Sequence, residues 1–412
     1  MRFLTTTVLA TCLFLLSVAP AHSQNPRRTE RAFVSSIAAL GMGDVGVALP
    51  HPMSGFFYNP AHLPHTPSAT RVLGLQGTLS DQVREQSSFF DDRLEPAIEQ
   101  GLDNIPDEQL ETLYNDALAI TGTPSQGSVG LLLPAFTRNL GGVVGIGGGL
   151  YAQTDASFRL YNAGLGVPQV SLINRNDFIA VASAGVQLPA GISGGATVKY
   201  TKRYLSFKDK PLDTFTSDEQ VVLLEGTNLG IDVGGLYEVN FLPLPGRLTV
   251  GMTVYDLLHT GYNYDVYGTP ADIPIVGSFI DASGSISAER VAAEVALAQA
   301  RFNLEQSYRI GAGYQLDRLG PFSDIAFGAD YIGYGSPQVD QTFLAHLHLG
   351  ARAHLTRFLA LRTGISQGYP SVGAGLHLGV FHVNYALHAV EQGRTPGQVS
   401  SYIHALRFAF EL

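Results

Sequence analysis

Apolar residues alternate with small or polar residues through much of the chain, most clearly from about residue 302 to the last residue. The runs are long enough to cross a membrane as tilted β-strands. Within residues 301–315 one face of the predicted strand carries Phe302, Leu304, Gln306, Tyr308, Ile310, Ala312 and Tyr314. In the last run Leu406, Phe408 and Phe410 oppose Arg407 and Glu411, so we expect the chain to end on a strand. One face suits lipid and the other suits a wet lumen.

The same two-faced pattern recurs from Ser128 onward, and counting its runs predicts about 14 strands. The predicted fold class is therefore all-β, a transmembrane antiparallel β-barrel over residues 71–412. An even number of strands is expected of a single-chain bacterial barrel, with its longer loops at the cell exterior. Two such excursions cover residues 207–227 and 259–300, and the second includes an Ala-rich segment with helical potential, Ala288–Ala300.

Two segments lack the strand pattern. Residues 24–70 are rich in Gly, Pro and His, and their backbone groups need partners that a barrel lumen provides, so we expect an N-terminal plug or hatch there. Residues 84–121 predict a short helical insert with Asp107 as a candidate N-cap. Its apolar face would be formed by Leu110, Leu113, Ala117 and Leu118.

The N-terminus has the features of a secretory signal peptide over residues 1–23. A basic residue, Arg2, precedes an apolar stretch, and Ala21-His22-Ser23 supplies the small residues that signal peptidase needs. We expect cleavage after Ser23. The single cysteine, Cys12, lies within this segment, so the mature chain should have no disulfide and no cysteine metal site.

Composition agrees with a barrel in the outer membrane of a Gram-negative bacterium, with membrane lipids as its surroundings. Charged residues make up only 15% of the chain, glycine is abundant at 46 residues, and tryptophan is absent, so aromatic girdles must use the 18 tyrosines and 22 phenylalanines. A net charge of −10 argues against nucleic acid as a partner.

Both ends of the chain resemble the PorV/PorQ-type outer-membrane proteins, relatives of the long-chain fatty-acid transporter (FadL) family. The resemblance rests on residues 39–48 (ALGMGDVGVA), on residues 55–63 (GFFYNPAHL) and on the C-terminal block from Leu361 to Ala386. It implies a 14-stranded barrel with an inward hatch that contains Asn59-Pro60-Ala61. Relatives pass hydrophobic small molecules or belong to the type IX secretion system. The long insert and the final Leu412 depart from the pattern.

Three motifs suggest chemistry, each with a simpler structural explanation. Gly41-x-Gly43-x-x-Gly46 matches a dinucleotide fingerprint but is followed by proline and glycine instead of a helix. The Gly-x-Ser-x-Gly matches around Ser193 and Ser366 lie beside predicted strands, whereas a nucleophile elbow needs a strand-to-helix turn. Histidines recur on polar strand faces, but without interleaved carboxylates they favour neutral lumen lining over metal binding: His346, His348, His354, His377, His382 and His388.

Six basic residues on the predicted barrel strands need lumenal partners where they face inward. Asp232, Glu305 or the hatch could pair with Lys199, Lys202, Arg203, Arg309, Arg352 and Arg362. Arg309 and Arg362 are also candidates for binding a ligand carboxylate through the guanidinium fork.

The predicted function is passive transport of a hydrophobic small molecule across the outer membrane, without catalysis, metal or cofactor. Aromatic residues beside Asn59 either pack the hatch against the wall or line an apolar pocket. The candidate ligand-binding residues are Phe56, Phe57, Tyr58, Asn59, Pro60, Leu63, Arg309 and Arg362. The main alternative is a secretion-system component that binds protein cargo or other subunits, and an outer-membrane enzyme is a third.

Overall fold

The computed structural model describes residues 35–101, 104–120, 124–162, 168–212, 221–267, 288–335, 342–391, 395–397 and 399–412. The predicted signal peptide, residues 1–23, lies outside the described residues, as does the start of the predicted hatch, residues 24–34. We use "the hatch" below for residues 35–68.

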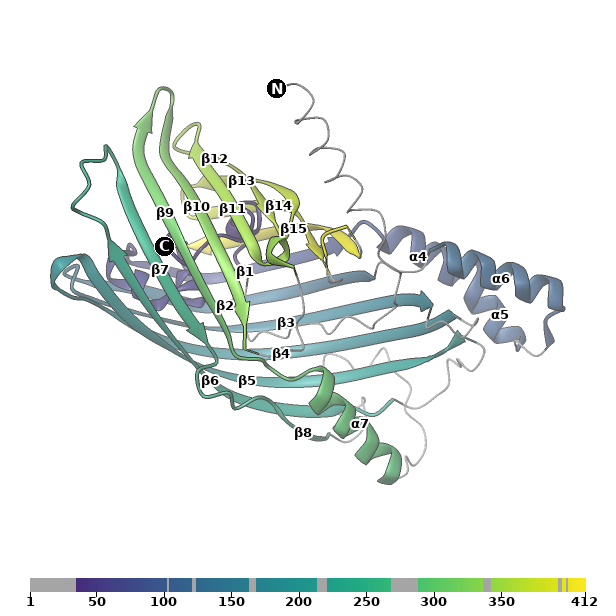
Figure 1. Cartoon of the computed structure of the whole chain (residues 1–412). Coiled ribbons are helices and arrows are strands. Elements are labelled where there is room, and N and C mark those ends of the chain that lie inside the picture. Colours follow the sequence, from purple (N-terminus) through teal and green to yellow (C-terminus); the bar gives the residue numbers. More distant parts are fainter. Residues whose placement is uncertain are drawn as a thin grey trace, which may run out of the picture.

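Fifteen strands in the described residues form one antiparallel sheet, and pairing of β5 with β6 closes it into a barrel (Figure 1). The short strand β8 and strand β7 pair with different parts of the same edge of β6, so the two share one position in the ring. The closed ring therefore has 14 strand positions, as the sequence predicts. The strands are β1 (Ala69–Ser80), β2 (Ser125–Leu140), β3 (Val144–Asn162), β4 (Pro168–Gln187), β5 (Ile192–Pro211), β6 (Leu224–Glu238), β7 (Arg247–Tyr255), β8 (Asn263–Val266), β9 (Ser307–Leu319), β10 (Phe322–Tyr334), β11 (Leu347–His354), β12 (Leu359–Ser366), β13 (Tyr369–Leu378), β14 (Phe381–Glu391) and β15 (Ser400–Glu411).

The wall has an apolar outer face and a polar inner face. On β5, Val198 and Tyr200 are 43% and 47% exposed, whereas Thr197, Lys199 and Thr201 between and beside them are buried. Similar exposed apolar side chains occur on β1, β2, β6, β7, β10, β12, β13 and β15. Such an alternation is stable only where one face meets lipid and the other meets polar groups.

The strand expected from residue 301 begins later, at Ser307. Phe302 and Leu304 are buried instead of facing lipid, because they pack in an apolar cluster with Leu205, Leu224 and Tyr264. Helix α7 (Ala288–Arg301), which contains the predicted Ala-rich helical segment, directs the chain into this cluster. Alternation alone therefore assigned these two residues to the wrong surface.

The two ends of the barrel differ. One end, which we call the turn end, has the short connections β2–β3, β4–β5, β9–β10, β11–β12 and β13–β14 together with the C-terminus. We call the other end the helical end. The wall reaches unequal heights, because β4 and β5 are each 20 residues long, whereas β11 and β12 have 8 residues each. Helices α4–α6 and α7 lie at this end, away from the C-terminus (Figure 1).

The predicted insert consists of α4 (Val83–Phe89), a π-helical turn (Phe90–Leu94), α5 (Glu95–Gln100) and α6 (Asp107–Ala119). Asp107 is the first residue of α6 and not the cap before it. Leu113 and Ala117 pack on Leu160 and Val170 of β3 and β4, with Leu110 at the margin. None of the helices in the described residues has the length and apolar character of a membrane span.

The hatch follows the inner wall around almost the whole ring. It contains α2 (Ile37–Leu40), α3 (Gly55–Tyr58) and a 3-10 helix, η1 (Pro60–His65). Contacts of Ser35 and α2 with β15 and β14 begin the circuit, and contacts with β13, β12, β11, β10, β9, β7, β6, β5, β4, β3 and β2 follow in that order. The chain then enters β1. An irregular segment thus finds its partners on the lumenal face.

Glycines of the wall allow the hatch backbone to approach this closely. A Cβ built on Gly195 of β5 would lie 2.6 Å from the Pro60 carbonyl carbon, and one on Gly350 of β11 would lie 2.0 Å from the Met42 oxygen. Equivalent contacts with hatch backbone occur at Gly145, Gly185, Gly251, Gly313, Gly364 and Gly373, and Gly234 makes room for the Asn59 side chain. The abundance of glycine therefore serves the hatch as well as the turns.

Gly195→Ala should destabilise the protein by about 1–3 kcal/mol, because its methyl group would overlap hatch backbone that has no room to move. The neighbouring Gly194→Ala is the control, since no atom lies within 4 Å of its Cβ position. Urea unfolding in lipid vesicles measures both. Equal midpoints for the two variants would contradict the assigned contact.

Candidate functional site

Arg309 of β9 connects the hatch to the wall through two carboxylates. Its Nη2 lies 2.8 Å from Asp44 Oδ2 of the hatch, and its Nη1 lies 3.3 Å from Asp330 Oδ2 of β10. Tyr58 donates a 2.6 Å hydrogen bond to Asp44 Oδ1. Because Arg309 is only 1% exposed, the two acidic partners compensate a charge that burial would otherwise penalise.

Asp330 also holds the hatch backbone directly. Its Oδ2 accepts hydrogen bonds from the Gly46 and Val47 amides at 2.7 and 3.0 Å. These amides follow a left-handed turn, with φ of +69° at Gly43 and +63° at Asp44. The glycine-rich motif therefore forms a tight turn whose free amides meet a wall carboxylate, which is the structural explanation that the sequence favoured.

Asn59 connects two segments of the hatch, around Val47 and Ala61, with the wall. Its side chain donates to the Val47 carbonyl at 2.9 Å and to the Gly235 carbonyl of β6 at 3.0 Å. Its Oδ1 accepts from the Ala61 amide at 3.0 Å and caps η1, with Pro60 at the first helical position. The Asn-Pro-Ala element is thus an N-cap that also fixes the position of the helix.

The aromatic residues before Asn59 form an apolar cluster against the wall. Phe56, Phe57 and Leu63 are no more than 2% exposed and pack with Leu132 of β2 and Tyr151 of β3. The rings of Phe57 and Tyr151 meet edge to face with centroids 5.2 Å apart. This is the packing role that the sequence analysis weighed against an apolar pocket.

The wall is interrupted beside this cluster. Between β1 and β2, Arg71 pairs with Ala135, and Gly74 pairs with Leu132. In these described strands, residues 72–73 and 133–134, which lie between those two pairs, are not paired with each other. The β1–β15 and β2–β3 registers also shift at this level. Pro134 lacks a backbone N–H, so it cannot donate to the ladder here. Two bulged strands thus lie side by side next to the aromatic cluster.

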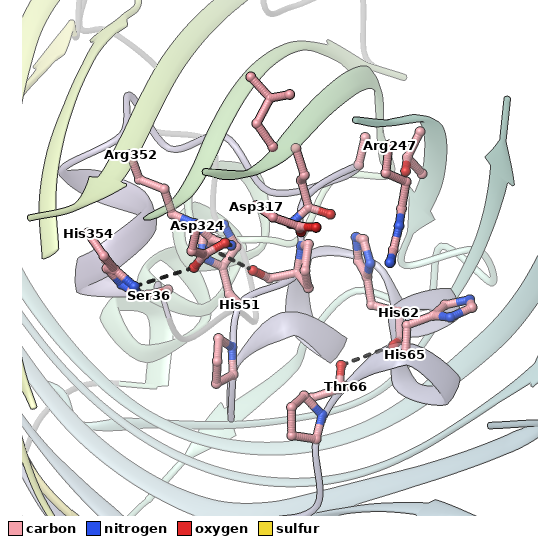
Figure 2. Close-up of a pocket in the computed structure, with 18 of the residues that line it drawn as sticks. Ser36, His51, His62, His65, Thr66, Arg247, Asp317, Asp324, Arg352 and His354 are labelled. Atoms are coloured by element: carbon pink, nitrogen blue, oxygen red, sulfur yellow. Dashed lines mark hydrogen bonds and ion pairs between the residues drawn. The ribbon is translucent and has the colours of Figure 1, made fainter. Parts of the chain in front are cut away.

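A polar cavity of about 630 Å³ opens between the hatch and the wall at the turn end. Hatch histidines His51 and His62 line one side, and burial lowers the pKa of each to about 3, so both are neutral at physiological pH. Arg352 donates to the Pro50 carbonyl of the hatch at 3.2 Å, and Arg352 and His354 both point toward Asp324, at 3.2 and 3.7 Å (Figure 2).

The lumenal cations differ in how they are compensated. Lys199 contacts Asp232 and Asp256 at 2.9 and 3.3 Å, and Arg203 contacts Asp177 at 2.7 Å. Lys202 pairs with Glu225 at a more exposed position. Arg362 lines the cavity with 9% of its surface exposed and has no hydrogen-bond or ion-pair partner among the described residues.

Both serines of the Gly-x-Ser-x-Gly motifs contact a histidine, but neither contact provides a general base. Ser193 Oγ lies 2.9 Å from His65 Nε2, yet its hydroxyl donates to Gln187 Oε1 at 2.7 Å. Ser366 Oγ lies 3.2 Å from His348 Nδ1, and the same nitrogen lies 2.7 Å from the Gly43 carbonyl, to which it donates. Ser193 thus donates to an amide oxygen, and the His348 nitrogen that faces Ser366 already donates to a hatch carbonyl.

The remaining histidines do not converge on a metal site. His346 Nδ1 lies 2.7 Å from the Ile332 carbonyl, and the His377 and His382 rings lie 4.9 Å apart at the cavity. His346 precedes β11 in a short 3-10 helix, so it does not share the strand with His348. Within the described ranges, no group of three histidine, cysteine or acidic side chains is placed to hold an ion.

The structure separates the candidate residues into three places. Phe56, Phe57 and Leu63 belong to the wall-facing cluster, and Tyr58, Asn59, Pro60 and Arg309 belong to the hatch contacts. Arg362 alone among the eight lines the cavity. Sequence reasoning missed Asp44 and Asp330 as the carboxylates opposite Arg309, although Asp44 lies within the motif it singled out.

Arg309→Gln should lower the free energy of unfolding by about 3 kcal/mol, because the buried Asp330 and the partly buried Asp44 would lose the cation that both contact. Lys202→Gln is the matched control, and its exposed pair should contribute under about 1 kcal/mol. Urea unfolding in lipid vesicles provides the comparison. A smaller loss for Arg309→Gln than for the control would show that the cluster does not hold the hatch.

No known family model matches the chain, and no curated protein matches it either. Solved structures with similar backbones include the toluene transporter TbuX of Ralstonia pickettii, at 13% identity, 94% coverage of this chain, 98% of that chain and a TM-score of 0.46. The toluene transporter TodX of Pseudomonas putida has 11% identity, 94% and 99% coverage and a TM-score of 0.46. The translocator domain of autotransporter NalP from Neisseria meningitidis has 9% identity, 83% and 88% coverage and a TM-score of 0.39.

Proposed function

We propose that the protein passively transports hydrophobic small molecules across the bacterial outer membrane, by a lateral route through the wall between β1 and β2. The observation that carries the proposal is the coincidence of two bulged, locally unpaired strands with the aromatic cluster behind them. A passage for an apolar molecule needs apolar surface on both sides and few backbone hydrogen bonds to break.

Apolar side chains continue from the outer surface to the hatch at this level. Val72 and Leu73 are 41% and 49% exposed on the lipid-facing side, and Leu132 is buried behind them against Phe56 and Phe57. A hydrophobic molecule on this route would stay in contact with apolar groups throughout. We infer that Phe56 and Phe57 contact the ligand.

The circuit of the hatch supports a lateral route over displacement of the hatch as a body. Moving the hatch would break the contacts of Asp44, Asn59 and Gly46 and the close backbone contacts on eight strands. At the wall interruption, local movement of a few side chains would be enough. A route beside the hatch therefore needs no shift of the hatch as a whole.

The orientation follows from the two ends of the barrel. Short turns of bacterial outer-membrane barrels face the periplasm and longer connections face outward, so we assign the turn end to the periplasm and the helical end to the exterior. The PorV/PorQ resemblance stays a prediction, and no feature of the described residues favours the secretion-system alternative.

Pro134→Val should reduce uptake about tenfold, equivalent to about 1.4 kcal/mol on the barrier, because it supplies the backbone N–H that the interrupted ladder lacks. Radiolabelled toluene, a neutral aromatic hydrocarbon, is the probe in cells that express the protein at matched levels. The control is Pro370→Val, since Pro370 lies in β13 where the register is unbroken. Equal uptake by the two variants would exclude the β1–β2 route.

A further inference from the structure

Arg362 is a buried cation that contacts no carboxylate among the described residues. Arg71 and Arg407 share this property, but Arg71 lies over the Tyr151 ring, and Arg407 donates to Gln76 and to the Ser35 carbonyl. Arg309, Lys199 and Arg203 each contact at least one carboxylate. Arg362 is 9% exposed, and its Nε and Nη1 atoms have neither solvent nor an acceptor. An unpaired buried charge is costly, and proteins usually avoid it or use it.

We propose that Arg362 is the centre of an anion-binding site in the periplasmic cavity, which takes the carboxylate or phosphate group of a small anionic molecule. The site is distinct in chemistry from the apolar route between β1 and β2, and the inference does not depend on that route.

The location of Arg362 meets the requirements of such a site. It lies on β12, in register with Arg352 of β11 on one side and Gly373 of β13 on the other. Its side chain extends along the wall to Gly375, whose Cβ position would lie 2.7 Å from both Nη atoms. The cavity of about 630 Å³ in front of it exceeds the volume of a small aromatic acid and is open at the turn end.

Nearby carboxylates are already engaged by other groups. Asp324 contacts Arg352 and His354 at 3.2 and 3.7 Å (Figure 2). Glu411 lies 3.6 Å from His382. The guanidinium of Arg362 therefore has a free fork in a region where a second arginine adds positive potential.

A polar neighbour completes the site. Asn384 of β14 also lines the cavity, and its Oδ1 has no donor. Its Oδ1 would lie 2.9 Å from the same Gly375 Cβ position that the Arg362 Nη atoms approach, so the two side chains are close together. Rotation of the amide would present its NH₂ to an oxyanion held by Arg362. Two unsatisfied groups thus converge on one point of the cavity wall.

Isothermal titration calorimetry on the full chain in detergent tests the proposal with benzoate, inorganic phosphate and neutral benzamide. Benzoate, phosphate or both should bind, and benzamide should not. Arg362→Gln should raise the Kd of the bound anion at least about tenfold, or about 1.4 kcal/mol. Binding of benzoate alone would assign a carboxylate ligand, and binding of phosphate alone a phosphate ligand.

Arg357→Gln is the matched control, because Arg357 lies exposed in the β11–β12 turn at the same end of the barrel. It should leave the Kd unchanged. Arg362→Lys, which keeps the charge and loses the fork, should weaken binding less than Arg362→Gln. A role in folding alone would leave anion-dependent stability unaffected, whereas we expect the bound anion to raise the Tm of the unmodified protein and not of Arg362→Gln.

Failure of both anions to bind the unmodified protein would overturn the proposal. Equal affinity of the unmodified protein and Arg362→Gln for the anion would also overturn it. Neither result bears on toluene uptake, which tests the proposed function separately.

Discussion

The close contact between the hatch backbone and a glycine-lined wall is the constraint on which the interior of this barrel depends. At Gly195, Gly234 and Gly350 a single methyl group would overlap the hatch. Strong polar contacts are then possible at short range, such as those of Asn59 with β6 and of Asp330 with the Gly46 amide. Small wall residues and directed hydrogen bonds together give an irregular segment one defined position.

The same closeness determines which lumenal charges are compensated. Arg309 faces hatch residue Asp44 and wall residue Asp330, so its charge contributes to the position of the hatch. Arg362 faces open cavity at the turn end, where the hatch offers neutral histidines. Arg309 thus lies with its two carboxylates in the packed part of the lumen, whereas Arg362 borders the part that remains available to a solute.

Sequence periodicity predicted the barrel, the number of strand positions and most inward and outward faces, because the side-chain period of a strand is local. It placed Phe302 and Leu304 on lipid, since the pattern cannot show that α7 covers them. Arg309 and Arg362 looked alike in sequence for a similar reason. The path of the hatch, which depends on contacts between distant residues, places Asp44 beside Arg309, and the neighbouring strand adds Asp330, whereas Arg362 has no such partner.

The circuit of the hatch also restricts the order of assembly. The hatch precedes every strand in the chain, yet it contacts even the last strand, β15, and the seam between the first and last strands, β1 and β15, closes around it. Its partners on β9 to β13 lie more than 250 residues away in sequence. Such distant contacts form late in folding. The hatch must therefore already be inside the curved sheet when β1 and β15 pair, and barrel closure encloses a segment that could not enter afterwards by the same path.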